Sequence, residues 1–128
     1  MTGGWIGTVA AKAAQIGPVI LATAGKAYRA GVPIAFGTDL LGGMHARQST
    51  EFTLRLPAMT PVEVLRGATS IAAELIGQGG KLGVIAQGAA ADLLVVAGDP
   101  TRTLAPLQAP EKGLLAVMQG GMFVRNRL

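Results

Sequence analysis

The sequence contains no cysteine, and His45 is its only histidine. The lack of cysteine excludes disulfide bonds and thiolate metal sites, and it leaves the redox compartment undetermined. Zinc sites take three or four protein ligands, so His45 as a ligand would need partners that this chain does not supply. From spacing alone, an ordinary loop histidine remains the simpler interpretation of His45, beside a contact with substrate or metal.

Charged residues and aromatic residues are also scarce, at 14% and 4% of the chain. The net charge of +4 is scattered, and Arg125 and Arg127 form its densest pair. Nucleic-acid binding needs basic residues concentrated on one face, usually with aromatic platforms, so we expect no nucleic-acid partner. No apolar run is long enough to span a bilayer, and the apolar stretch 16–24 lacks the positive flank of a signal peptide. We therefore expect a cytoplasmic protein without a membrane partner.

What the chain does contain is enough apolar material for one domain. Half of its 128 residues are hydrophobic, which argues against disorder and for a real core. Its 19 glycines and seven prolines predict short elements joined by frequent turns.

The first part of the chain has the pattern of a parallel α/β unit. A weak helix is predicted from Val9 to Ile16, and a stronger one begins with Pro18 at its first position and stops at Gly31. The apolar run Val32–Phe36 then predicts a short strand covered on both faces.

Further elements follow on either side of a boundary that we predict near residue 78. A short helix is expected over 49–56, and Thr60 and Glu63 form a capping box for the next helix. Thr69 or Ser70 caps a further helix that ends at Gly77. Beyond the boundary, strands are predicted over 82–85 and 91–97, and 114–118 with 122–124 as a hairpin.

The candidate site lies where the predicted strand 32–36 ends. Asp39 follows Phe36 and Gly37, and loops after strand carboxyl ends carry the sites of parallel α/β proteins. A carboxylate there can bind a metal or take up a proton. An Asx-turn, in which Asp39 bonds its own loop amides, explains the same residue equally well. Asp92 and Asp99 fit backbone caps or turns better than chemistry.

Three stretches of the chain resemble the C-terminal part of the metal-dependent amidohydrolase superfamily, nearest to imidazolonepropionase-like and Xaa-Pro dipeptidase-like hydrolases. They are G-T-D-L-L-G-G-M-H-A-R-Q-S-T-E over 37–51, A-T-S-I-A-A-E-L-I-G over 68–77, and 83–100, which contains A-A-A-D-L-L-V-V-A-G-D-P. The resemblance covers about residues 26–126 of the chain. The opening M-T-G-G-W-I-G-T-V-A-A-K-A-A-Q matches the family poorly.

This resemblance implies an α/β fold that is the C-terminal fragment of a (β/α)8 TIM-like barrel, followed by part of a small β-sandwich subdomain. Residues 1–77 would be the end of the barrel and 78–128 the small β-subdomain. It also implies that Asp39 is both the metal ligand and the catalytic carboxylate, accepting a proton from metal-bound water, and that His45 lies near substrate. The cofactor would be a divalent metal, with zinc as the expected ion, and the substrate a small amide, cyclic amide or dipeptide.

The departure from the family is that its other metal ligands would lie upstream of residue 1. One carboxylate and one imidazole are too few for tight zinc binding. We therefore expect a hydrolase of C–N bonds that is truncated and inactive as this chain alone. The alternative is a non-catalytic remnant, or a subunit that completes a barrel with a separate N-terminal partner. The strand 32–36 would have bare edges, which predicts self-association unless something covers them.

Overall fold

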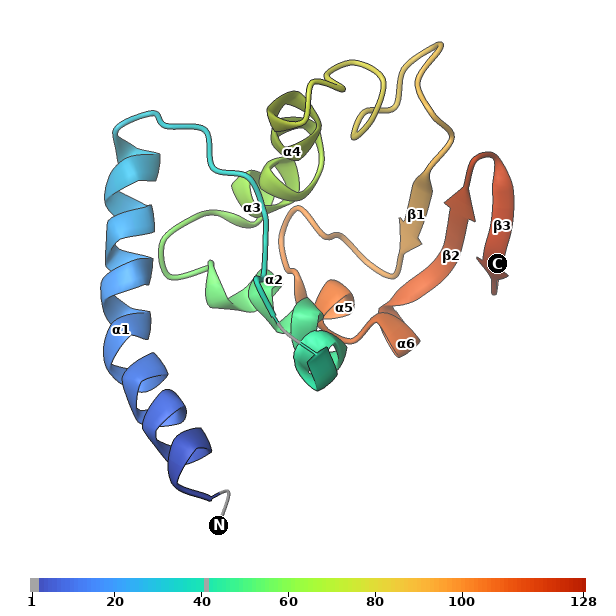
Figure 1. Ribbon diagram of the computed structural model, residues 1–128. Coiled ribbons are helices and arrows are strands. Elements are labelled where there is room, and N and C mark those ends of the chain that lie inside the picture. Colours follow the sequence, from blue (N-terminus) through green and yellow to red (C-terminus); the bar gives the residue numbers. More distant parts are fainter. Residues whose placement is uncertain (1–2, 41) are drawn as a thin grey trace.

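The computed structural model of the chain describes residues 3–40 and 42–128. A long helix lies along one side, short helices fill the middle, and a small sheet lies on the opposite side (Figure 1). The elements are, in chain order, α1 (Gly3–Arg29), the 3-10 helix η1 (Gly42–Thr50), α2 (Glu51–Leu54), α3 (Pro61–Ala68), α4 (Ser70–Leu75), β1 (Leu93–Val96), α5 (Ala105–Gln108), α6 (Pro110–Gly113), β2 (Leu114–Gln119) and β3 (Met122–Asn126).

Helix α1 is a single helix of 27 residues, so the prediction of a new helix beginning at Pro18 is wrong. Pro18 lies inside it, where the ring removes one backbone hydrogen bond. The alanine-rich turns before Pro18 have high helix propensity, and they carry the helix through the proline. The predicted stop is confirmed, because the helix ends at Arg29 and Gly31 has a left-handed φ of 79°.

The run 32–40 is neither helix nor strand, which corrects the predicted strand Val32–Phe36. Its apolar sequence suits a strand, but a strand also needs a neighbour to form a ladder. Within the described residues, the Phe36 N–H donates to the Gly67 carbonyl oxygen of α3 at 2.9 Å, and no strand lies beside it. The run follows an open path from the end of α1 towards η1 (Figure 1).

The start of α3 confirms half of the predicted capping box. The Thr60 hydroxyl oxygen accepts a hydrogen bond from the Glu63 N–H at 3.3 Å. The Glu63 carboxylate instead pairs with Arg66 at 3.4 Å. The next helix starts at Ser70 as predicted, but the Thr69 hydroxyl donates back to the Leu65 carbonyl oxygen at 2.7 Å and does not cap it.

The sheet is antiparallel, in the order β1-β2-β3. Gly120 and Gly121 have φ values of 55° and 83°, which a two-residue turn between β2 and β3 requires, and the predicted hairpin is confirmed. The Asp92 carboxylate accepts from the Gly120 N–H at 2.7 Å, so its predicted role as a backbone cap is also confirmed. The strand predicted over 82–85 is wrong, because the described residues there make only an isolated bridge between Gly79 and Leu82.

The core lies between α1, α3 and α5, and it joins both parts of the chain. Its buried cluster consists of Met59, Val64, Leu104 and Leu107. Partly buried residues from α1, from the run 32–40 and from the sheet pack around it, among them Tyr28, Phe36 and Val96. The division into units 1–77 and 78–128 stays a prediction.

Across the described part of the chain, none of the helices combines the length and the apolar character needed to cross a membrane.

Candidate functional site

Asp39 is the only non-glycine residue with a positive φ, 49°, in the described part of the chain. This left-handed conformation is uncommon for a residue with a side chain, although aspartate tolerates it better than most. Its side chain is exposed. Within the described residues it makes no hydrogen bond to a backbone amide, and the amide of residue 41, where an Asx-turn would bond, lies outside them. The Asx-turn alternative is therefore untested.

The backbone that leads to Asp39 is held by a cluster of four side chains, which we call the Arg55 cluster: Glu51, Arg55, Phe36 and Phe52. Arg55 donates to the Ala35 carbonyl oxygen at 3.1 Å and pairs with Glu51 at 2.7 Å. Its guanidinium lies 5.0 Å from the centre of the Phe36 ring, a cation–π contact. Phe36 in turn lies 4.6 Å from Phe52 between ring centres.

The Arg55 cluster was not predicted from the sequence, where Glu51 was noted only as the end of the motif 37–51. The side chains of Arg55 and Glu51 are only 14% and 21% exposed. Their i,i+4 spacing was visible and predicts a pair. The hydrogen bond from Arg55 to the Ala35 carbonyl oxygen joins residues 20 positions apart, and nothing in the sequence indicated it.

His45 lies exposed in η1 and is not joined to Asp39. No hydrogen bond or ion pair links the two residues in the portion of the chain that the structure describes. Nor do the described residues include any group of three or more histidine, cysteine, aspartate or glutamate side chains that could hold a metal ion. One carboxylate and one imidazole that is not bonded to it do not fit a metal centre, so no catalytic step through a metal follows from these residues.

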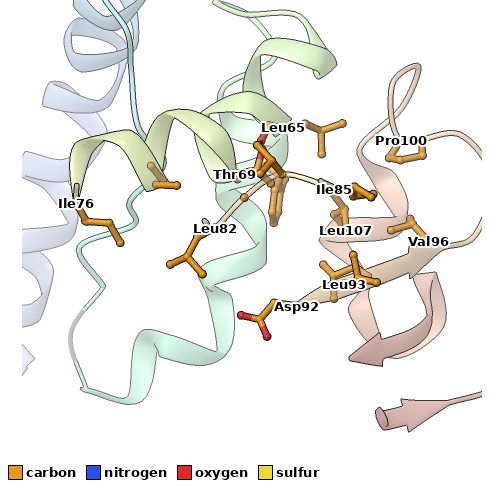
Figure 2. A pocket seen from close by; sticks show the side chains of 17 residues that line it. Leu65, Thr69, Ile76, Leu82, Ile85, Asp92, Leu93, Val96, Pro100 and Leu107 are labelled. Carbon is orange, nitrogen blue, oxygen red and sulfur yellow. Dashed lines mark hydrogen bonds between the residues drawn. The ribbon is translucent and has the colours of Figure 1, made fainter. Parts of the chain in front are cut away.

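An open apolar cleft of about 680 Å³ lies among the described residues, and it is not the predicted site. Its walls come from α3, α4, the loop 82–85 and β1, with Leu65, Ile76, Leu82 and Leu93 around it (Figure 2). Neither Asp39 nor His45 lines it. Two polar side chains that line it already have hydrogen-bond partners: the Thr69 hydroxyl donates to the Leu65 carbonyl oxygen, and the Asp92 carboxylate accepts from the Gly120 N–H. The cleft is therefore an apolar packing surface and not a site with free polar groups for chemistry.

The family model and the similar proteins of known sequence indicate the same family. The model of the "Amidohydrolase family" matches residues 10–124, which begins further upstream than the residues that carried the resemblance. Ochratoxinase from Aspergillus niger is 32% identical over 101 residues, which are 78% of this chain and 21% of that protein. Imidazolonepropionase from Chromobacterium violaceum is 40% identical over 74 residues, 55% of this chain and 18% of that protein.

Solved structures agree with these relatives. An amidohydrolase crystal structure superimposes with a TM-score of 0.79 at 40% identity, covering 84% of this chain and 26% of its own. The structure of a Xaa-Pro dipeptidase with methionine bound in its active site superimposes with a TM-score of 0.77 at 34% identity. The match covers 90% of this chain and 28% of the dipeptidase. The chain therefore spans about a fifth to a quarter of the length of these relatives. With a family match over most of its residues and the same fold in solved members, this chain belongs to the amidohydrolase family.

Proposed function

We propose that this chain is the Asp39-bearing part of a metal-dependent hydrolase of C–N bonds, and that the 128 residues alone do not catalyse the reaction. The family generally uses divalent metals and acts on small amide or peptide substrates. The similar proteins include an imidazolonepropionase and a Xaa-Pro dipeptidase, and the second name states a dipeptide substrate. A small amide, cyclic amide or dipeptide is accordingly the proposed substrate class, in a cytoplasmic setting.

The fold assignment that goes with this proposal is the end of a (β/α)8 barrel over 1–77 and part of a small β-subdomain over 78–128. Two observations support it. The superposition covers most of this chain but only about a quarter of the solved amidohydrolase, as expected for a part of the larger fold. Residues 32–36 also have the sequence of a buried strand but form no ladder among the described residues, as expected for a barrel strand without its neighbours.

The observation that carries the function is the position of Asp39. An exposed carboxylate stands at the end of the run 32–40, directly after backbone that the Arg55 cluster holds. Such a carboxylate can take up a proton or offer an oxygen to a cation. Because the described residues form no metal site, the remaining ligands, for zinc or another divalent ion, would come from outside these 128 residues. His45 is proposed to contact substrate only in that complete site.

The first experiment measures the isolated chain. The purified protein is dialysed against zinc, its metal content is determined, and hydrolysis of Xaa-Pro dipeptides is followed. We expect less than stoichiometric zinc and no hydrolysis above buffer. Hydrolysis that depends on zinc and disappears in Asp39→Asn would show that the chain is active alone.

The second experiment measures Asp39 in a complete enzyme. A chimera in which residues 26–126 replace the matching part of the 40%-identical amidohydrolase is assayed with and without Asp39→Asn. We expect the substitution to lower kcat at least a hundredfold. Asp99→Asn is the matched control, because its side-chain oxygen can still accept from the Thr101 N–H at 2.9 Å. Equal activity of the two variants would refute the role of Asp39.

A further inference from the structure

The Arg55 cluster joins the two ends of the loop that carries Asp39. Phe36 comes before this loop and Phe52 comes after it, and the centres of their rings lie 4.6 Å apart. The described residues of the loop, which we call the Asp39 loop, are 37–40 and 42–50. Side-chain contacts therefore close the base of a loop that leaves the body of the protein after Phe36 and returns to it at α2.

Arg55 is the member of the cluster that contacts both ends of the Asp39 loop. Its guanidinium donates to the Ala35 carbonyl oxygen at 3.1 Å before the loop and pairs with Glu51 at 2.7 Å directly after it. It also lies 5.0 Å from the centre of the Phe36 ring. Because the Arg55 side chain is only 14% exposed, water and salt compete with these contacts less than they do at a surface pair. Arg55 therefore ties the two ends of the loop together.

The Asp39 loop has few contacts that could fix its position from within. None of its described residues is buried. A β-carbon at Gly37 or Gly43 would meet nothing within 4 Å among the described residues. A segment with so little buried surface opens easily unless its ends are held. The position of Asp39 therefore depends on the contacts at the base of the loop.

We propose that Arg55 is a positioning residue for Asp39, and that it acts by closing the base of the Asp39 loop. Among the described residues, its polar contacts are with Ala35 and Glu51 and not with Asp39 itself. The proposal rests on the proposed function, because the position of Asp39 matters for the rate only if this carboxylate takes part in hydrolysis. A carboxylate that takes up a proton must lie within hydrogen-bond reach of it, so a small displacement lowers the rate strongly.

The first test is amide hydrogen exchange in the isolated chain, which needs neither metal nor activity. In a 3-10 helix each N–H bonds three residues back, so the amides of residues 45–50 in η1 report whether the loop is closed. Arg55→Met removes the donors and the charge but keeps an unbranched side chain. We expect these amides to exchange at least tenfold faster in Arg55→Met than in the wild type.

Two control variants separate this effect from other causes. Arg66→Met is the matched control for the loss of an arginine, because Arg66 pairs with Glu63 in α3 and its side chain is 59% exposed. Ala116→Gly removes a buried methyl group from β2, so it lowers overall stability from a position outside the Arg55 cluster. In both controls we expect exchange at residues 45–50 to stay within twofold of the wild type.

The second test measures kcat in the chimera described above, at saturating metal and at a temperature where circular dichroism shows that each variant is folded. We expect Arg55→Met to lower kcat at least tenfold, and Arg55→Lys, which can still donate to Ala35, to recover part of that loss. Arg66→Met should leave kcat within twofold, since a purely structural role would not change kcat of folded molecules. If Arg55→Met does not fold, Glu51→Gln weakens the same base and should lower kcat at least threefold.

The outcomes distinguish this proposal from the proposed function. Amides of residues 45–50 that exchange equally fast in the wild type and Arg55→Met, or equally fast in Ala116→Gly and Arg55→Met, overturn the proposal. An unchanged kcat in Arg55→Met beside a large loss in Asp39→Asn also overturns it and leaves the proposed function intact. If neither substitution lowers kcat, the proposed function is refuted, and hydrogen exchange alone decides whether Arg55 closes the loop.

Discussion

Gly67 offers a sharp test of how the backbone before Asp39 is held. It lies buried in α3, and a β-carbon added there would come within 2.8 Å of the Ile34 carbonyl oxygen. Its own carbonyl oxygen accepts the Phe36 N–H at 2.9 Å. Gly67→Ala therefore pushes the run 34–36 away from α3, because both contacts involve backbone atoms that cannot rotate aside.

The size of the effect follows from three opposing contributions. Alanine stabilises a helix interior by about 1 kcal/mol over glycine. Overpacking against fixed atoms costs about 1–3 kcal/mol. Loss of the hydrogen bond between Phe36 and Gly67 costs about 1 kcal/mol more. We expect Gly67→Ala to lower the free energy of unfolding by about 1–3 kcal/mol, with the two destabilising contributions prevailing.

Urea unfolding followed by far-ultraviolet circular dichroism measures this change. Gly43→Ala is the matched control: Gly43 lies in η1 with nothing within 4 Å of the added β-carbon and without a positive φ. Replacing glycine at such an open position should stabilise the protein by about 0.4–1 kcal/mol. If Gly67→Ala is as stabilising as Gly43→Ala, then α3 does not approach the run 34–36 closely and the account of its positioning is wrong.

Two further substitutions test the core and the Arg55 cluster. Leu104 is 0% exposed, so Leu104→Ala should lower the free energy of unfolding by about 2–5 kcal/mol in the same urea assay; a loss below 1 kcal/mol would contradict its place in the core. Arg55→Met removes the bond to Ala35 and the pair with Glu51, and it should cost about 1–3 kcal/mol. Arg55→Lys keeps the charge but not the planar group over Phe36, so it should recover only part of that loss; full recovery would show that charge alone matters.

The sequence predicts best those features whose cause is local. Thr60 caps α3 because a hydroxyl at that position can reach the N–H three residues on, whatever packs nearby. Gly120 and Gly121 form the hairpin turn because both positions need a positive φ. Asp99 accepts from the Thr101 N–H within the turn predicted for it.

The failures concern features that depend on distant residues. Two strands were predicted, over 32–36 and 82–85, that the structure does not form in the described residues. Both have suitable composition, but a strand forms only beside a partner strand, and composition does not supply one. The start of α1 was missed for the opposite reason. A proline signal was given more weight than the helix propensity of the residues before it, and propensity prevailed.

In the candidate site, too, the sequence predicted the feature with a local cause and did not predict the contacts between distant residues. The pattern of an apolar run, Gly37 and a carboxylate was enough to select Asp39, but the family resemblance was needed to favour chemistry over a turn. The structure adds that the backbone before Asp39 is fixed from within this chain, by Arg55 at Ala35 and by Gly67 at Phe36. The run is held by one contact on each edge, and its core-facing side chains, Ile34 and Phe36, are kept in place by packing within this chain. We therefore expect the ligands that complete the proposed site to bind beside Asp39 without having to order the backbone that leads to it.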